Sequence, residues 1–241
     1  MNGMPEYKFT VSVSPMDCTG CGSCANVCPG KKGEKALTMQ NFEENTYRQK
    51  YFDYAVELPE KKDVIAKFKE TTVKGSQFKK PLLEFSGACA GCGETPYAKL
   101  ATQLFGDRMY IANAIGCSSI WGNSSPSTPY TVNQEGRGPA WSNSLFEDNA
   151  EFGYGMHLAN IAVRKGLRAK VEELAASASS EELKAAANEY IETFQIGAKN
   201  GSATDNLVAL LEKDDSALAK EILEGKDFLA KKSQWIFGGD G

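Results

Sequence analysis

Histidine is almost absent from this sequence, which has one, His157, among 241 residues. Zinc centres built on three histidines are therefore excluded within the chain. There is no run of about 18 apolar residues, so we expect no membrane-spanning helix. Basic residues are not in excess either, since 27 Lys and Arg face 31 Asp and Glu for a net charge of −4. That balance argues against binding to nucleic acids or to anionic membranes.

A secretion signal is also absent, because residues 1–7 lack a basic stretch followed by an apolar one. The seven cysteines are an odd number, which suits a disulfide framework poorly. They are instead bunched at gaps of two and three residues, as in sites for soft metals. We therefore expect metal-ligating cysteines rather than disulfides, in a reducing cytoplasm and in a protein of one or two domains.

The first cysteine cluster is a C-x₂-C-x₂-C-x₃-C-P run, typical of bacterial ferredoxins. Glycines between the cysteines allow tight turns that aim backbone amides at the sulfurs. Zinc is the alternative, but zinc sites usually use paired C-x₂-C knuckles that lie far apart. The run therefore predicts a [4Fe–4S] site, with ligands at Cys18, Cys21, Cys24 and Cys28.

The fourth cysteine of this run raises a question of completeness. In two-cluster ferredoxins that cysteine ligates the other cluster, which has a run of its own. This sequence has no second run, so either Cys28 folds back onto the same cluster or part of the domain is missing. We favour the second interpretation.

A second set consists of Cys89, Cys92 and, 25 positions further on, Cys117. A single C-x₂-C is a weak signal, since it also fits a redox dithiol or half a zinc site. The neighbouring glycines suit a loop that closely surrounds a cofactor. Three ligands again leave one position to be filled.

Periodicity divides the chain into a small α+β module and a larger α/β region. A strand at 8–13 with a partner at 36–40 suggests a ferredoxin-like module over residues 1–60. Residues 61–80 are expected to be a linker or a short solvated helix. From residue 81 the pattern becomes that of an α/β domain.

Within 81–241 we expect regular elements on both sides of a long loop. Thr95 and Pro96 mark the start of a helix over residues 97–105. The remaining expectations are a strand at 108–112, an ordered functional loop at 121–149, a helix at 151–174, about three short solvated helices at 175–232, and a strand at 235–237.

The last strand runs into Gly-Gly-Asp-Gly. Ligands of α/β sheets bind beyond the carboxyl ends of the strands. Asp240 between glycines is therefore a candidate ligand of a divalent cation beside a phosphate, although it could also be an ordinary turn residue. The chain looks cut inside a binding site.

Together these motifs resemble the pyruvate:ferredoxin (or flavodoxin) oxidoreductases, thiamine-diphosphate enzymes with three iron–sulfur clusters. The resemblance covers residues 1–165 and 233–241. It is carried by the first cysteine run, FSGACAGCGETPY at 85–97, GCSSIWG at 116–122 and GRGPAWSNSLFEDNAEFG at 136–153. Strings of this length are far more specific than a lone glycine motif.

The resemblance implies a fold that is incomplete at both ends. Residues 1–60 would be the second half of a two-cluster ferredoxin domain. Residues 81–241 would be the N-terminal part of a thiamine-diphosphate-binding α/β domain, with a helical insertion at 166–232. The remaining segments of the enzyme would supply the rest.

The resemblance also implies cofactor ligands. Cys89, Cys92 and Cys117 would hold the cluster nearest the thiamine, with a fourth cysteine beyond this chain. Asp240 would bind the Mg²⁺ that clamps the diphosphate. The cofactor itself would be approached by Gly93, Glu94, Ser118 and Ser119.

The implied activity is oxidative decarboxylation of pyruvate to acetyl-coenzyme A. Electrons would pass through [4Fe–4S] clusters to ferredoxin or flavodoxin, in an enzyme that is a homodimer when complete. We expect the isolated chain to be inactive. The alternatives are a stand-alone [4Fe–4S] electron-transfer protein and a structural zinc protein.

Several residues have simpler interpretations. Glu94 fits equally well as a carboxylate favoured by a helix N-terminus. Arg137 could bind an anion or form an ion pair that stabilises its loop. We expect a structural or exposed role for His157, and core positions for Trp121 and Trp141.

Overall fold

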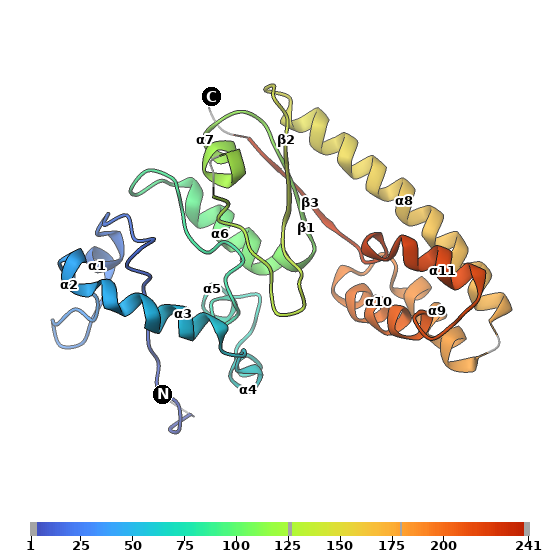
Figure 1. Ribbon diagram of the computed structural model, residues 1–241, viewed down its shortest axis with the longest axis horizontal. Helices are drawn as coiled ribbons and strands as arrows, with labels where there is room; N and C mark the ends of the chain where they lie inside the picture. Colours follow the sequence, from blue (N-terminus) through green and yellow to red (C-terminus); the bar gives the residue numbers. More distant parts are fainter. Residues whose placement is uncertain (1–3, 125–126, 179, 239–241) are drawn as a thin grey trace. The chain divides into compact units, whose positions relative to one another are not determined.

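The computed structural model describes residues 4–124, 127–178 and 180–238. The chain divides into two compact units, Met1–Gln103 and Leu104–Gly241. We describe each unit by itself (Figure 1). None of the helices in the described residues is long and apolar enough to cross a membrane.

The first unit consists mainly of short helices. They are α1 (Ser23–Val27), α2 (Phe42–Asn45), the 3₁₀ turn η1 (Thr46–Arg48), α3 (Gln49–Glu57), α4 (Lys62–Ile65) and α5 (Val73–Ser76). The longer α6 (Glu94–Phe105) begins in this unit. It starts three residues earlier than the sequence predicted, so Thr95 and Pro96 lie in its first turn.

The two strands expected in the first unit are not formed. Residues 8–13 and 36–40 contain no strand, and the only bridge described in this part of the chain joins Lys31 to Glu34. The alternating apolar side chains of 8–13 face solvent, with Phe9 65% and Val11 55% exposed. A strand is stable only where other strands and a covered face support it, and within the described unit these segments have neither. The prediction of these two strands is therefore wrong.

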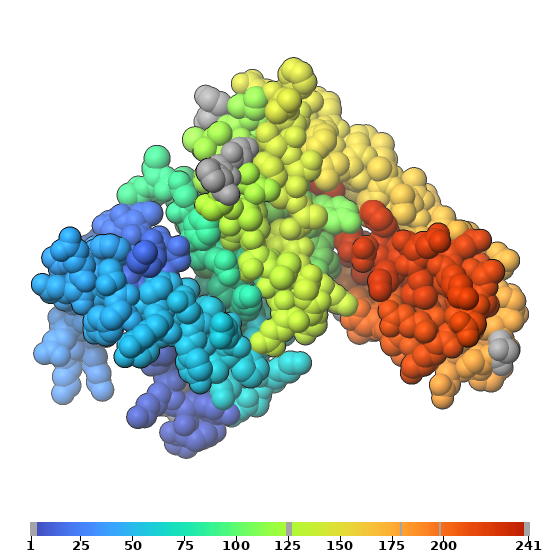
Figure 2. All heavy atoms as spheres, in the orientation of Figure 1, coloured from blue at the N-terminus to red at the C-terminus, as the bar shows by residue number. Residues whose placement is uncertain are grey.

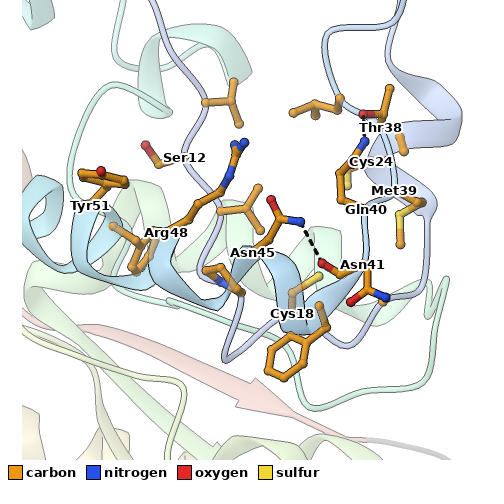
Figure 3. A pocket seen from close by; sticks show the side chains of 18 of the residues that line it. Ser12, Cys18, Cys24, Thr38, Met39, Gln40, Asn41, Asn45, Arg48 and Tyr51 are labelled. Atoms are coloured by element: carbon orange, nitrogen blue, oxygen red, sulfur yellow. Dashed lines mark hydrogen bonds between the residues drawn. The ribbon is translucent and has the colours of Figure 1, made fainter.

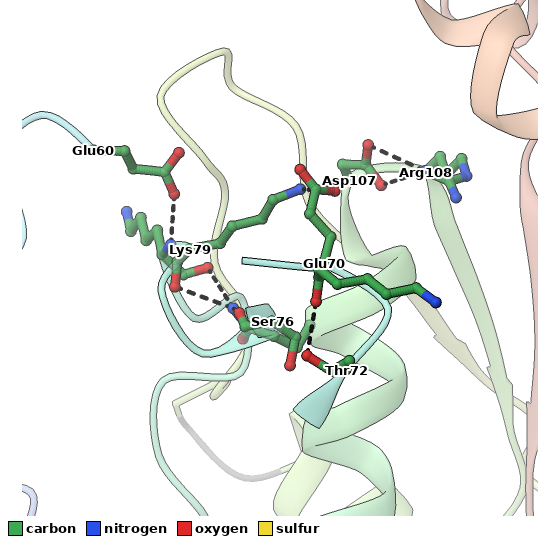
Figure 4. A network of polar contacts seen from close by, with 10 residues as sticks. Glu60, Glu70, Thr72, Ser76, Lys79, Asp107 and Arg108 are labelled. Atoms are coloured by element: carbon green, nitrogen blue, oxygen red, sulfur yellow. Dashed lines mark hydrogen bonds and ion pairs between the residues drawn. The ribbon is translucent and has the colours of Figure 1, made fainter. Parts of the chain in front are cut away.

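Residues 61–80 form two short helices held by polar contacts rather than a plain linker (Figure 4). The Lys80 amide donates to Glu60 Oε1 at 2.6 Å. The Thr72 side chain caps α5 by accepting from the Gly75 amide at 3.0 Å. The Gln103 side chain of α6 donates to the Ser76 carbonyl at 2.7 Å, so this segment is tied to the helix that follows it.

The second unit contains a parallel three-stranded sheet in the order β2-β1-β3. Its strands are β1 (Met109–Asn113), β2 (Ala140–Asn143) and β3 (Ser233–Phe237). The central β1 is almost wholly buried, as expected for a parallel strand covered on both faces. Asn113 lies beside Asn143 on one side and Phe237 on the other, so the carboxyl ends of all three strands meet at one edge.

The predicted loop at 121–149 is more regular than expected. The turn η2 (Gly106–Arg108) precedes β1, and α7 (Cys117–Ser119) leads into the π-helical turn η3 (Ile120–Ser124). The strand β2 then lies inside the segment predicted to lack regular structure. Ala-Trp-Ser-Asn has no apolar alternation, so only pairing with β1 identifies it as a strand.

A long helix connects the sheet to a bundle of helices (Figure 1). It is α8 (Asn149–Ser177), and it is followed by α9 (Glu181–Thr193), α10 (Gly197–Leu211), α11 (Ala217–Glu224) and the turn η4 (Lys226–Phe228). The expected helix and the three helices after it are therefore confirmed. In the space-filling view α9, α10 and α11 form one closely packed body (Figure 2).

These helices enclose a core of their own and are not merely solvated. Val171, Ala187, Tyr190, Leu207 and Ile222 are among the side chains with no solvent exposure. A buried cation also joins the bundle. The Arg164 guanidinium of α8 donates to the carbonyls of Phe194 and Leu229 and to Asn200 Oδ1, each at 3.1 Å.

Candidate functional site

The first cysteine run surrounds α1. Gly20 and Gly22 have φ of 69° and 74°, a left-handed conformation that glycine adopts without strain. Gly22 is the N-cap of α1 and Cys28 its C-cap, with Cys24 inside the helix. All seven cysteines of the chain are free thiols.

The environment of Cys28 favours a thiolate. A hydrogen bond from the Leu37 backbone lowers the pKa of Cys28, and the backbones of Gly30 and Ala36 and the charge of Lys35 act in the same direction. Hydrogen bonding to Ser23 likewise lowers the pKa of Cys21. The thiolate is the form of cysteine that ligates metals.

A tight turn clamps this run. Gly30 has φ of 60°, and a Cβ there would lie 1.9 Å from the Glu34 carbonyl oxygen, so the chain approaches itself more closely than any other residue would allow. Beyond the turn, Lys35 Nζ donates to the carbonyls of Ala25 and Asn26 at 2.7 and 2.9 Å. The lysine thereby caps the C-terminal end of α1 between Cys24 and Cys28.

A groove of about 870 Å³ lies beside the run. Figure 3 shows Cys18 and Cys24 in its wall, together with Arg48 and Tyr51. Its lining also includes apolar side chains, such as Val11, from the segments predicted to be strands. Two of the four predicted ligands therefore border the same groove.

In the part of the chain that is described, no three His, Cys, Asp or Glu side chains are grouped closely enough to hold a metal ion. Ligation of iron–sulfur clusters by the thiols of the first run therefore stays a prediction from their spacing.

The loop that carries Cys89 and Cys92 is closed at its base. The Cys92 amide donates to the Cys89 carbonyl at 3.0 Å, and the hydroxyls of Ser86 and Thr95 lie 2.8 Å apart. Gly93 follows Cys92, and Glu94 is the first residue of α6. Glu94 thus occupies the position where the helix dipole favours a carboxylate. This agrees with the simpler interpretation of Glu94 as a residue of a helix N-terminus.

Cys117 begins α7 in the second unit, and its side chain is exposed. The two serines that follow are buried, at 2% and 1% exposure. The Ser119 hydroxyl donates to the Gly116 carbonyl at 2.7 Å and accepts from the Gly116 amide at 3.1 Å. Ser118 Oγ accepts from Asn113 Nδ2 at 2.8 Å. Both hydroxyls therefore hold the Cys117 turn in place.

Asn113 is the site residue that sequence reasoning missed. It ends β1 and has no solvent exposure. Besides Ser118, its side chain bonds to Trp141 Nε1 at 2.8 Å and to the Phe237 carbonyl at 3.2 Å. A polar residue at the end of a buried strand is the signal that could have identified it.

The carboxyl edge of the sheet carries further polar groups. Within the described chain, Asn143 Oδ1 and Asp148 Oδ1 are buried and have no hydrogen-bond partner. Gly238 follows β3, and a Cβ there would lie 2.5 Å from Asn149 Nδ2. Asp240, the predicted magnesium ligand, lies outside the described residues.

The other residues singled out from the sequence differ in their contacts and their burial. Arg137 forms an ion pair with both carboxylate oxygens of Asp205, which raises the pKa of Arg137. Trp121 is 5% exposed and belongs to the core. Trp141 is half-buried and His157 exposed. Of the two interpretations of Arg137, the ion pair is the one present.

Comparison with known proteins gives a consistent result. The profile described as a 4Fe-4S binding domain matches residues 11–31. The chain is 50% identical, over 99% of its length, to a pyruvate-flavodoxin oxidoreductase of Klebsiella pneumoniae. It is 52% identical, over 97% of its length, to a pyruvate:ferredoxin oxidoreductase of Moorella thermoacetica. The resemblance to the pyruvate:ferredoxin (flavodoxin) oxidoreductases is therefore confirmed.

The chain spans about a fifth of the length of these oxidoreductases, 20% in both cases. It is also 43% identical, over 97% of its length, to the mitochondrial pyruvate dehydrogenase [NADP(+)] of Euglena gracilis, of which it spans 13%. The same segment thus occurs in proteins named for three different electron acceptors. The match alone therefore does not identify the acceptor.

Proposed function

We propose that this chain is the part of a pyruvate:ferredoxin (flavodoxin) oxidoreductase that joins iron–sulfur ligands to the thiamine-diphosphate domain. In the complete enzyme, pyruvate and coenzyme A yield acetyl-coenzyme A, carbon dioxide and a proton. The two electrons released pass to ferredoxin or flavodoxin. The observation that carries this proposal is the 50% identity along nearly the whole chain to a protein of that name.

The donor set supports the iron–sulfur part of the proposal. Thiolates are the usual ligands of [4Fe–4S] clusters, and amide hydrogen bonds to sulfur tune the reduction potential. The backbone hydrogen bonds around Cys28 are of this kind. By the ferredoxin pattern, Cys18, Cys21 and Cys24 ligate one cluster and Cys28 contributes to another. The ligand roles of Cys89, Cys92 and Cys117 rest on the resemblance alone.

The carboxyl edge of the sheet supports a bound diphosphate with Mg²⁺. Ligands of open parallel sheets bind at this edge, and Mg²⁺ prefers oxygen ligands such as carboxylates. Within the described chain, the unpaired oxygens of Asn143 and Asp148 lie in residues that end or follow β2, and Asp240 follows β3 in the sequence. Thiamine diphosphate, when bound, supplies the electron sink for decarboxylation. In this proposal Gly93, Glu94, Ser118 and Ser119 line its site.

The proposal extends to the setting of the enzyme. A reducing compartment keeps thiolates free for clusters, so we place the enzyme in the cytoplasm. We also propose that it acts as a homodimer together with the segments that this chain does not include.

A chimera tests the function. The matching fifth of the Klebsiella pneumoniae enzyme is replaced by this chain, and the product is purified without oxygen. We expect reduction of a viologen dye that depends on both pyruvate and coenzyme A. Cys24→Ser should abolish electron transfer to flavodoxin, the acceptor in the name of the Klebsiella pneumoniae enzyme. Asn26→Ala, at an exposed position of the same helix, should leave it unchanged.

Two results would contradict the proposal. One is a folded chimera, with its full content of iron and sulfide, that reduces no dye with pyruvate. The other concerns the 241-residue chain itself after anaerobic reconstitution. About one zinc per chain with no acid-labile sulfide would favour the structural zinc protein instead.

A further inference from the structure

We propose that Asn113 is a positioning residue that fixes the Cys117 turn and the end of β3 relative to each other. A predicted cluster ligand and the predicted magnesium-binding loop would then keep a constant spacing. The inference deepens the proposed function and rests on it for its role in the enzyme. The juxtaposition itself is a property of the second unit.

The geometry depends on one side-chain amide. Asn113 Nδ2 donates one hydrogen bond to Ser118 Oγ at 2.8 Å and the other to the Phe237 carbonyl at 3.2 Å. The two N–H directions of a planar amide are fixed relative to each other. Neither acceptor can therefore shift alone without weakening a bond.

The third bond and the backbone fix the amide itself. Asn113 Oδ1 accepts from Trp141 Nε1 at 2.8 Å, and its backbone carbonyl accepts from the Ser144 amide at 2.8 Å. Both partners belong to β2 or to the residue just after it. The amide thus cannot rotate to follow one acceptor, because its oxygen is held from the opposite side.

An asparagine is an unfavourable choice for this position on packing grounds alone. The centre of a parallel sheet is normally apolar, and burying an amide is unfavourable unless it is hydrogen-bonded. Met109 and Ile111 on the same strand are fully buried apolar residues. Unlike those two side chains, the Asn113 amide forms hydrogen bonds that connect the end of β1 with β2 and β3.

The residues it connects are those next to the predicted ligands. Ser118 directly follows Cys117, and Phe237 is the last residue of β3, three positions before Asp240. Displacement of Ser118 would therefore move the adjacent Cys117, and displacement of Phe237 would move the end of β3, from which the sequence continues towards Asp240.

The first test uses the full 241-residue chain and hydrogen exchange resolved by peptide. Asn113→Asp keeps the size of the side chain but removes both donors. We expect amide exchange to become about tenfold faster in the peptides covering 114–120 and 234–238 together. Ser118→Ala, a milder change, should accelerate only the first peptide. Trp141→Phe removes the bond that holds the amide oxygen but leaves both donors, so it should accelerate exchange in both peptides, by less than Asn113→Asp does.

The second test uses the chimeric enzyme. Asn113→Asp should lower retention of thiamine diphosphate on gel filtration and alter the electron paramagnetic resonance spectrum of the reduced clusters. The KM for pyruvate should stay unchanged while kcat falls, with kcat calculated per molecule that retains both thiamine diphosphate and clusters. General destabilisation would lower the number of such molecules but not the rate of each one.

The outcomes separate the two proposals. If the unsubstituted chimera retains neither thiamine diphosphate nor clusters, the proposed function fails and only the exchange result remains. If it retains both, and Asn113→Asp and Ser118→Ala change neither exchange nor spectrum, the positioning role is refuted.

Discussion

Two glycines on α8 are expected to respond oppositely to the same substitution. Gly153 is buried where the helix crosses the sheet. A Cβ there would lie 2.4 Å from Ile236 Cγ1 and 3.1 Å from Ala112 Cβ. Gly155, two residues on, is exposed, and a Cβ added to it would meet no atom of the described residues within 4 Å. The chain thus offers its own matched control.

The magnitudes follow from helix propensity and packing. Replacing glycine by alanine inside a helix stabilises by about 1 kcal/mol, so Gly155→Ala should raise the free energy of unfolding by that amount. Gly153→Ala gains the same stabilisation from helix propensity. Its added methyl group, however, overpacks the contact with the sheet, which costs about 1–3 kcal/mol. Ile236 is stiff at χ1 and Ala112 cannot rotate away, so the upper end applies. The two variants should differ by about 3 kcal/mol.

Tryptophan fluorescence in urea is the appropriate assay. All three tryptophans, Trp121, Trp141 and Trp235, lie in the second unit, so their emission follows that unit even if the first unfolds separately. Removing the obstructing side chain with Ile236→Ala should make Gly153→Ala less harmful in the double variant. Equal stabilisation by Gly153→Ala and Gly155→Ala would refute the packing argument.

Three further predictions concern other parts of the chain. Gly30→Ala must displace the Glu34 backbone, whereas Gly33→Ala, also at positive φ, meets open space among the described residues. The cluster content after reconstitution should therefore fall markedly in the Gly30→Ala variant and not in the Gly33→Ala variant. Burial raises the pKa of Tyr190 to about 12. The contribution of its neutral phenol to the free energy of unfolding is therefore complete below pH 10 and is lost as the pH rises towards 12. Up to about 3 kcal/mol is involved, and Tyr190→Phe should remove that part of the pH dependence in urea titrations. The isolated chain should reduce no viologen dye with pyruvate and coenzyme A.

Local signals predicted α6, the helices of the second unit and the strands β1 and β3 well. Pro96 and the apolar spacing after it indicated α6, and the run from Met109 indicated β1. The core among α9, α10 and α11 was missed because alanine-rich helices look solvated until they pack together. Ala187, for example, has no solvent exposure, although nothing in its neighbouring sequence requires burial.

Non-local pairing explains the remaining errors. Residues 8–13 alternate like a strand, but pairing partners and a covered face decide whether a strand forms. Conversely, β2 lacks alternation and exists because Asn113 and Ile111 have neighbours there in register. The periodicity of a segment indicates which of its faces could be buried. Whether the segment forms a strand depends on a second segment, distant in the sequence, that pairs with it.

The candidate site shows the same division between chemistry and placement. Cysteine spacing indicates iron–sulfur chemistry because ligand type and interval are local properties of the sequence. Asn113 carries no motif, since its partners Ser118, Trp141 and Phe237 lie 5, 28 and 124 positions away. Its importance follows only from the strand order β2-β1-β3, which places the end of β1 within reach of both neighbouring strands. A polar residue that ends the central strand of a parallel sheet is therefore a better guide to such a site than its sequence neighbours are.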